Sequence, residues 1–272
     1  MNIISKIETS LIDNTFYYNL ISYFKHYNDP KNQYVELDNL FQFQSPLPYP
    51  DFNAILSQIQ IVDEEVHLNN PTQLFNDLSL PYYWWVFKDL NSNELVNKIK
   101  EKKLRNTGDI IVLGAEIAKL VEIFSTPNSL FVEPVNNADK MKKWAEITSY
   151  RYNIKGTFVD TFLDNFKDVR FTEDTYWSKY IGWLNGEPVA SSTLIKSQGI
   201  AAVYDVSIIP RYRNWGIENS MIMIPLRQAK RDGYHVGVTI ATIGEVNRIK
   251  PLNFVELFKI QRYLGVPPRA KK

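Results

Sequence analysis

The chain has 272 residues, of which 44% are hydrophobic and 22% are charged, a balance that permits a hydrophobic core and excludes a disordered polyelectrolyte. It contains no cysteine, which excludes a disulfide scaffold, a thiol nucleophile and a cysteine zinc site. No apolar run approaches the roughly 18 residues of a membrane span, and the first residues lack the pattern of a signal peptide. We therefore expect a cytoplasmic protein that does not bind membranes.

Charge and glycine are distributed unevenly between the two halves of the chain. Residues 1–127 carry 10 Lys and Arg against 16 Asp and Glu, a net charge of −6, whereas residues 128–272 carry 21 against 14, a net charge of +7. Of the 11 glycines, only Gly108 and Gly114 precede residue 150. This asymmetry predicts two unlike domains, over 1–127 and 128–272, and favours the basic second half as the host of an anionic ligand.

The first half contains helix and strand patterns that alternate along the chain. Residues 10–27 have apolar positions at helical spacing, and the prolines within 45–52 require an extended loop. Asp51 is a candidate N-cap of a helix that would reach Ile61. The other expected elements are a strand or bent hairpin over 34–43, a short helix after Pro71, a strand over 82–87, a helix over 92–103 and a strand over 109–117.

The second half shows the same alternation more clearly. Asn185 and Gly186 predict the turn of a hairpin, and Pro210 closes a long apolar strand. The expected strands cover 129–135, 176–184, 189–195, 199–209, 235–242 and 254–264, and the expected helices cover 137–151, 156–167, 216–231 and 244–251. This order predicts an α+β domain with a mixed sheet flanked by helices. The first half fits the same order less clearly, so we expect two such domains in tandem.

Residues 203–234 are the segment most informative about function. A buried strand ends at a proline, a short basic loop follows, and an amphipathic helix begins near Gly216. The unpaired N–H groups and the dipole of a helix N-terminus attract phosphate, and Arg211 and Arg213 strengthen the attraction to a diphosphate. Gly216 would let the main chain approach the phosphate closely. An ordinary turn between a strand and a helix is the alternative interpretation.

This loop resembles the pyrophosphate-binding loop of the GCN5-related N-acetyltransferases (GNATs), whose pattern is Arg/Gln-x-x-Gly-x-Gly/Ala. The matching residues are Pro210, Tyr212, Arg213, Gly216 and Ile217. Further segments that resemble the family follow in the correct order over 129–264: the hairpin 182–190, Ala229-Lys230 with Gly233-Tyr234, Leu252-Asn253-Phe254, and the final strand 254–258. The first half resembles the degenerate amino-terminal partner of two-domain members, through residues 48–53, 83–86 and 104–108.

The resemblance implies the splayed sheet of the acyl-CoA N-acyltransferase fold and direct transfer of an acetyl group from acetyl-CoA to an amine. The pantetheine arm would bond to main-chain groups of Val206, Ser207 and Ile208 in the gap after Asp205, like an added strand. The other implied contacts with acetyl-CoA are Arg211, Arg213, Asn214, Gly216, Ile217, Glu218 and Asn219. The second half would bind acetyl-CoA, and the first half would cover it and form part of the cleft for an amine acceptor that the sequence does not identify.

Three positions depart from the family pattern. Asn214 and Glu218 stand where glycines are common, and Ile249 stands where many members have a tyrosine thought to protonate the departing CoA thiolate. A carboxylate at Glu218 repels a diphosphate unless it points into solvent or pairs with Arg213, although the helix dipole favours an acidic residue in the first turn. Glu218 and Ile249 therefore keep open a second hypothesis, an acyl-CoA-binding or interaction protein with an eroded catalytic site.

Asp205 is the candidate general base, because it lies where a bulge would open the sheet; a solvent-facing carboxylate on a strand is the alternative. His235 opens a strand and either titrates near neutrality in the site or is an ordinary surface histidine. His26 and His67 have no carboxylate or second histidine at ligand spacing, so we expect no metal site. The absence of a Gly-x-Ser-x-Gly element argues against hydrolysis through a covalent intermediate. The basic half lacks a stripe of Lys and Arg interleaved with aromatics, which argues against nucleic-acid binding.

Overall fold

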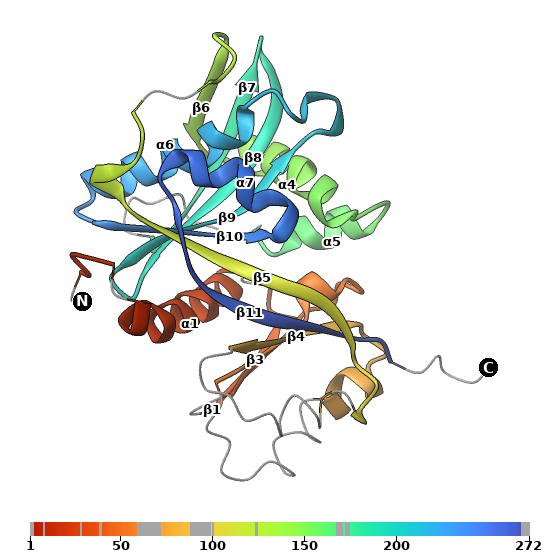
Figure 1. Ribbon diagram of the computed structural model, residues 1–272. Coiled ribbons are helices and arrows are strands. Elements are labelled where there is room, and N and C mark those ends of the chain that lie inside the picture. Colours follow the sequence, from red (N-terminus) through yellow and green to blue (C-terminus); the bar gives the residue numbers. More distant parts are fainter. Residues whose placement is uncertain are drawn as a thin grey trace. The chain divides into compact units, whose positions relative to one another are not determined.

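Figure 1 shows the chain as a computed structural model. The structure describes residues 3–7, 9–27, 29–37, 40–58, 72–87, 99, 101–122, 125–166, 171 and 175–267. The chain divides into two compact units, each built from two segments of the sequence. Unit 1 comprises Met1–Asn28 and Val112–Leu257, and unit 2 comprises Asp29–Ile111 and Phe258–Lys272.

These units differ from a single division of the chain between residues 127 and 128. Residues 1–28 belong to unit 1 together with most of the second half, and the last residues of the chain belong to unit 2. Two strands, β5 (Arg105–Glu116) and β11 (Val255–Gly265), each contain a boundary between the units. The assignment of a covering role to 1–127 and of acetyl-CoA binding to 128–272 concerns function and remains a prediction.

Unit 1 contains a mixed sheet in which β6, β7, β8, β9 and β10 are successive neighbours. The pairs from β6 to β9 are antiparallel, and β10 runs parallel to β9. Asn185 and Gly186 both have positive φ, +51° and +82°, which forms the predicted hairpin turn between β7 and β8. The strands are β6 (Leu130–Pro134), β7 (Trp177–Leu184), β8 (Glu187–Ser197), β9 (Ile200–Ile208) and β10 (Val236–Thr242).

Helices cover both faces of this sheet. On β8, the Ser191 hydroxyl lies 2.9 Å from the Thr148 hydroxyl of α4. The preceding residue Ala190 points to the opposite face, where a Cβ added at Gly182 would meet both Ala190 and Met221 of α6. Because neighbouring residues of a strand point to opposite faces, α4 and α6 lie on opposite sides of the sheet. The helices are α1 (Thr9–Lys25), α4 (Ala138–Tyr152), α5 (Phe158–Asp164), α6 (Ile217–Arg231) and α7 (Ile243–Ile249).

The first helix of the chain, α1, packs in unit 1. Its Asn19 side chain donates to the Ser197 hydroxyl at 3.0 Å, and the Tyr204 hydroxyl donates to Asn19 Oδ1 at 2.8 Å. These bonds join α1 to β8 and β9. The helix predicted over 10–27 is confirmed, with the bounds Thr9–Lys25. The first residues of the acidic half therefore complete the unit that contains the predicted phosphate loop.

Unit 2 contains β1, β2, β3, β4 and the parts of β11 and β5 within 258–265 and 105–111, in this order. β3 and β4 are parallel, whereas the pairs β1–β2, β2–β3 and β4–β11 are antiparallel. Its strands besides β5 and β11 are β1 (Gln33–Leu37), β2 (Leu40–Gln44), β3 (Ala54–Ser57) and β4 (Tyr82–Phe87).

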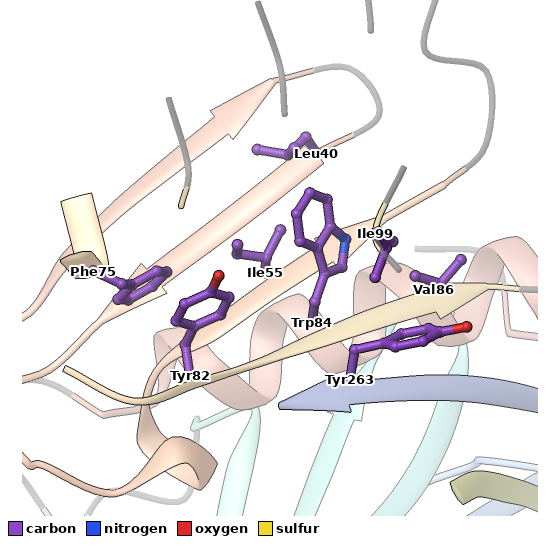
Figure 2. Close-up of a cluster of buried hydrophobic side chains, with 8 residues drawn as sticks. All are labelled: Leu40, Ile55, Phe75, Tyr82, Trp84, Val86, Ile99 and Tyr263. Carbon is purple, nitrogen blue, oxygen red and sulfur yellow. The ribbon is translucent and has the colours of Figure 1, made fainter. Parts of the chain in front are cut away.

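Figure 2 shows a buried cluster of unit 2 with Trp84 among aliphatic and aromatic side chains. The Trp84 indole N–H donates to the Ser57 hydroxyl at 2.9 Å, which satisfies its polar group inside the core. Phe75 stacks on Tyr82 with ring centroids 4.7 Å apart. The cluster consists of Leu40, Ile55, Phe75, Tyr82, Trp84, Val86, Ile99 and Tyr263.

The prediction of a helix beginning at Asp51 is wrong. The structure has a single 3-10 turn, Pro50–Phe52, followed directly by β3. Asn53 provides the reason, because its buried side chain accepts the Ser45 amide at 3.0 Å and its carbonyl accepts the Tyr83 amide at 2.9 Å. These bonds to distant residues hold the chain extended for pairing with β4 and outweigh a local N-cap.

Most other predicted elements are confirmed with shifted ends. Residues 34–43 form the hairpin of β1 and β2 rather than one strand, and residues 72–77 are helical after Pro71. The strand predicted over 109–117 begins earlier, as β5. The helix predicted over 92–103 lies largely outside the described residues.

Candidate active site

The sheet of unit 1 opens between β9 and β10. Their parallel pairing ends at Val203 and Thr239, where the Thr239 hydroxyl donates to the Val203 carbonyl at 3.0 Å. β9 continues to Ile208 and β10 to Thr242, and within these described residues no further pairing joins the two strands. Residues 204–208 of β9 therefore have a free edge on the side of β10.

A bulge lies at the start of this free edge. In the pairing of β8 with β9, Ser191 faces Ser207 and Thr193 faces Tyr204, so β9 contains one extra residue between them. Asp205 has a φ of +55°, in the left-handed region that favours glycine at such a bulge. For a residue with a Cβ this conformation costs about 1–2 kcal/mol, so other contacts must hold Asp205 in it.

The main-chain groups of Val206 and Ile208 point into the gap. The Ile209 amide donates to the Val189 carbonyl of β8 at 2.9 Å, and alternate residues of a strand direct their N–H and C=O groups to the same neighbour. The groups of Ser207 therefore face β8, whereas those of Val206 and Ile208 face the free edge. Val206, Ser207 and Ile208 are the three residues predicted to contact a pantetheine arm through their main chain. Of these, Val206 and Ile208 direct their main-chain groups into the gap.

The Asp205 carboxylate is buried and accepts hydrogen bonds from three hydroxyl groups. Asp205 is 4% exposed; Tyr23 and Tyr152 donate to its Oδ1 at 2.6 and 2.5 Å, and Thr193 donates to its Oδ2 at 2.7 Å. The Ser207 hydroxyl donates to its main-chain carbonyl at 3.0 Å. Burial, together with this carboxylate, raises the pKa of Tyr23 well above its usual 10.0. The solvent-facing alternative for Asp205 is wrong, and these bonds offset the strain at the bulge.

A buried lysine interacts electrostatically with this carboxylate and contacts a buried histidine. Lys179 is 1% exposed and His26 is 2% exposed, with Lys179 Nζ 3.0 Å from His26 Nε2. The amine lies 3.5 Å from the ring centre of Trp144 and 4.2 Å from that of Phe166. Burial lowers the pKa of Lys179 well below 10.5, an effect that Asp205 opposes. Burial and the neighbouring Lys179 lower the pKa of His26 well below 6.5.

Neither Lys179 nor His26 is among the predicted site residues, yet the sequence carries a signal for both. Lys179 lies two residues after Trp177 and two residues before Ile181, so all three side chains share one face of the strand. His26 follows Tyr23 by one helical turn and precedes Tyr27, which places it among aromatic residues. The two-residue period of the strand predicts a buried amine at Lys179, and the helical spacing of α1 predicts a buried imidazole at His26.

The loop between β9 and α6 carries the residues predicted to bind phosphate. Arg211 NH2 lies 2.6 Å from a carboxylate oxygen of Glu187, and the Tyr212 hydroxyl donates to the same oxygen at 2.5 Å. Arg213 is exposed and pairs with no carboxylate in the part of the chain that the structure describes. Gly216, with a φ of +77°, is the N-cap of α6 and provides no side-chain cap. The N-terminus of α6 therefore has no side-chain cap from Gly216, and Arg213 precedes Gly216 by three residues.

The fold itself requires glycine at position 216, because a Cβ there would lie 2.5 Å from the Ser125 carbonyl oxygen. We expect Gly216→Ala to lower the free energy of unfolding by about 2 kcal/mol, from the left-handed backbone and this clash. Urea denaturation of both proteins measures the loss. Gly244→Ala is the matched control, since nothing lies within 4 Å of a Cβ at that position of α7. Equal effects of the two substitutions would contradict the prediction.

Glu218 belongs to an ion-pair network beside the gap. Arg248 Nε lies 3.1 Å from Glu218 Oε2, and Glu245 Oε1 lies 4.0 Å from Arg248 NH2 and 3.9 Å from Arg151 NH1. Arg151 NH1 also donates to the Val206 carbonyl at 2.9 Å. Burial raises the pKa of Glu218, and Arg248 opposes this rise. Burial would also raise the pKa of Glu245, but Arg151 and the hydrogen bonds from Thr242 lower it overall. Glu218 therefore pairs with Arg248, a partner that neither of the two conditions considered for this carboxylate had named.

The remaining predicted positions lie in the core, at the surface or outside the described residues. Ile249 is 3% exposed in the core and donates no proton. His235 is exposed, in agreement with the surface alternative, and His67 lies outside the described residues. The described residues contain no group of three or more histidines or carboxylates able to hold a metal ion. In the same part of the chain, no helix is long and apolar enough to cross a membrane.

Comparison with sequence profiles of protein families gives no match, and no curated protein matches the sequence. Solved structures do match it along most of its length. A GCN5-related N-acetyltransferase from Kribbella flavida superposes with a TM-score of 0.68 at 14% identity, covering 94% of this chain and 95% of that chain. A GCN5-related N-acetyltransferase from Sphaerobacter thermophilus gives 0.61 at 10% identity, over 88% of this chain and 84% of that one. A tandem GNAT protein from the clavulanic acid biosynthesis pathway gives 0.55 at 6% identity, over 89% and 86%.

These similarities identify the fold as that of the GNAT acyl-CoA N-acyltransferases, in a two-domain form. The predicted α+β class, with a mixed sheet flanked by helices, is confirmed. At such low identities the likeness establishes the architecture, and the reaction must be argued from the residues of the site.

Proposed function

We propose that unit 1 binds acetyl-CoA in the gap between β9 and β10 and transfers its acetyl group to an amine. The observation that carries this proposal is a free strand edge followed by a helix N-terminus without a side-chain cap. Val206 and Ile208 direct main-chain groups into the gap, and a short loop joins them to Gly216 at the start of α6. Acetyl-CoA has the complementary groups, because its pantetheine arm carries amides and its diphosphate is an anion. The GNAT fold supports the same ligand.

The residues at the phosphate end suit this ligand. Arg213 is exposed and lies close in sequence to Gly216, so it can reach a diphosphate at the helix N-terminus. Arg211 is already engaged by Glu187 and contributes less. The carboxylate of Glu218 pairs with Arg248, which reduces its repulsion of a diphosphate. Asn214, Ile217 and Asn219 complete the loop and first turn that we assign to the ligand.

The reaction that we propose needs a neutral amine, an oriented thioester and a hydrogen-bond donor for the developing oxyanion. The amine nitrogen attacks the thioester carbonyl, the C–N bond forms, the C–S bond breaks, and CoA leaves as a thiolate. The Val206 amide, which points into the gap beside the bulge, is the assigned oxyanion donor. Because Ile249 donates no proton, the thiolate leaves unaided, which its low pKa permits.

We assign Asp205 as the final acceptor of the amine proton and Tyr152 as the residue that relays the proton to it. Asp205 is too buried to meet an acceptor directly, at 4% exposure. Tyr152 is partly exposed and bonds to the carboxylate at 2.5 Å, so its hydroxyl can take the proton from the amine while passing its own to Asp205. Tyr152 lies in the last turn of α4 and was not predicted from the sequence.

In this proposal residues 128–272 supply the acetyl-CoA site, and residues 1–127 cover it on the acceptor side. The net charge of −6 on residues 1–127 favours a cationic amine as the acceptor. α1 already contributes Tyr23 to the Asp205 carboxylate. Calorimetry with CoA, followed by assays of thiol release from acetyl-CoA with polyamines, amino acids and aminoglycosides, tests the proposal. No binding at high micromolar CoA would contradict it.

Arg213→Ala is expected to weaken CoA binding about tenfold, because a charge-assisted hydrogen bond to phosphate contributes about 1.5–3 kcal/mol. Calorimetric titration with CoA at constant ionic strength measures the change. Arg231→Ala is the matched control: it removes the same charge from the opposite end of α6, where Arg231 bonds only to Gln228 among the described contacts. Equal losses in both variants would show that net charge, and not this loop, determines affinity.

A second candidate function is acyl-CoA binding without catalysis. It is favoured by Ile249, which occupies the position of the family's tyrosine, and by Glu218 in the first turn of α6. Tight CoA binding without thiol release across the whole amine panel would support this candidate over the acetyltransferase.

A further inference from the structure

Arg151, the penultimate residue of α4, contacts the free edge of β9. Arg151 NH1 donates to the Val206 carbonyl at 2.9 Å, and this carbonyl points into the gap. The next residue, Tyr152, bonds to Asp205 at 2.5 Å. Two consecutive residues of α4 thus bind two consecutive residues of the bulge, so the fold places this guanidinium at the gap.

A second acceptor for the guanidinium lies close by. Glu245 Oε1 is 3.9 Å from Arg151 NH1, too far for a hydrogen bond but close enough for attraction. The Glu245 carboxylate is itself fixed, because its Oε2 accepts the Thr242 amide and hydroxyl at 2.8 Å each, in the capping box of α7. A small movement of Arg151 would replace its bond to the Val206 carbonyl with a direct bond to this carboxylate.

We propose that Arg151 is a latch that sets the affinity of the site for acyl-CoA. In the free protein it occupies the Val206 carbonyl, the acceptor that a pantetheine amide needs; on binding, it moves to Glu245. The inference rests on the proposed function, because it concerns the same gap. The apparent dissociation constant then equals the intrinsic constant divided by the fraction of protein in which the latch is open.

The latch predicts changes opposite in sign to those expected from charge alone. CoA is an anion, so removing a positive charge should weaken binding and removing a negative charge should strengthen it. We expect Arg151→Met to bind CoA about tenfold more tightly, because the competitor is lost. We expect Glu245→Gln to bind several-fold more weakly, because the displaced guanidinium loses its charged acceptor. Glutamine preserves the capping box, so α7 is retained.

The experiment is calorimetric titration of the full chain with CoA, for wild type, both single variants and the double variant. In the Arg151→Met background, Glu245→Gln should no longer weaken binding, because the guanidinium that moves to this carboxylate is absent. Lys142→Met, an exposed residue of the same helix, is the control for loss of a positive charge and should not tighten binding. Arg151→Lys should give an intermediate affinity, and thermal melting checks that every variant is folded.

Equal or weaker CoA binding by folded Arg151→Met would overturn the latch and leave the proposed function intact. The same conclusion follows if Glu245→Gln has the same effect with and without Arg151. Failure of wild type and Arg151→Met alike to bind CoA would overturn the proposed function and the latch together.

Discussion

Asp205→Ala is expected to lower the free energy of unfolding by about 3–5 kcal/mol, the largest loss predicted for this chain. The substitution leaves the buried Tyr23 and Thr193 hydroxyls, and that of Tyr152, without the carboxylate they share. It also places an alanine at a φ of +55° with no side-chain bond to offset the strain. Urea denaturation at neutral pH measures the loss.

Asp205→Asn is the matched control for this prediction. Asparagine tolerates positive φ and keeps an oxygen for the two tyrosines, so we expect less than half the loss. The same variant tests the assigned role in proton transfer, because an amide does not take up a proton near neutrality. Retained stability with lost thiol release would support that role. Equal stability losses in the two variants would contradict the importance assigned to the hydrogen bonds.

Lys179→Met is expected to raise the free energy of unfolding by about 1–3 kcal/mol at pH 7 and to flatten its dependence on pH. Burial holds the pKa of Lys179 in the folded protein well below 10.5, so unfolding takes up a proton at any pH between the folded and unfolded values. The stability of the wild type therefore rises as the pH increases toward 10.5. At that pH, folding no longer requires free energy to remove a proton from the amine. Methionine removes this cost while filling a similar volume, although His26 loses a polar contact.

Unfolding in urea at several values between pH 7 and pH 10 measures this prediction. The wild-type free energy should increase across the series, and the Lys179→Met values should change much less. Lys142→Met removes an exposed lysine of α4 and should retain the wild-type slope. Parallel slopes for wild type and Lys179→Met would show that the amine is protonated in both folded and unfolded states. His26 adds a dependence of the same sign below pH 6.5, because burial also lowers its pKa.

The two predictions concern one buried polar cluster on the α4 face of the unit 1 sheet. α1 contributes Tyr23 to Asp205 and His26 to Lys179. Because α1 begins near the start of the chain, the first 28 residues belong physically to the unit that contains the proposed acetyl-CoA site. A shortened chain that began at residue 128 would leave both polar groups without these contacts.

Features encoded by neighbouring residues were predictable from the sequence. The hairpin at Asn185-Gly186 follows from the positive φ that its turn requires. The loop before α6 follows from Pro210, the two arginines and Gly216, and the helix expected over 137–151 is present as α4 with Asn137 as its N-cap. The bulge expected near Asp205 is present as well.

Features that depend on distant contacts were not predictable in the same way. A local N-cap favoured a helix after Asp51, but the buried Asn53 and pairing with β4 produced a strand. Glu218 meets Arg248, which lies on another helix, and not the nearby Arg213. Tyr23 lies 182 positions before the carboxylate it bonds, and no spacing in the sequence relates the two.

The sequence by itself determined the fold class, the order of the elements in the second half and the position of the basic loop before α6, because turn residues and hydrophobic periods act over a few neighbouring residues. Only the tertiary structure decided which side chains occupy the gap and what surrounds Asp205. The reason is physical: a buried carboxylate or guanidinium takes whichever partners the packing of separate helices and strands brings within hydrogen-bond distance, and local pattern does not encode that choice.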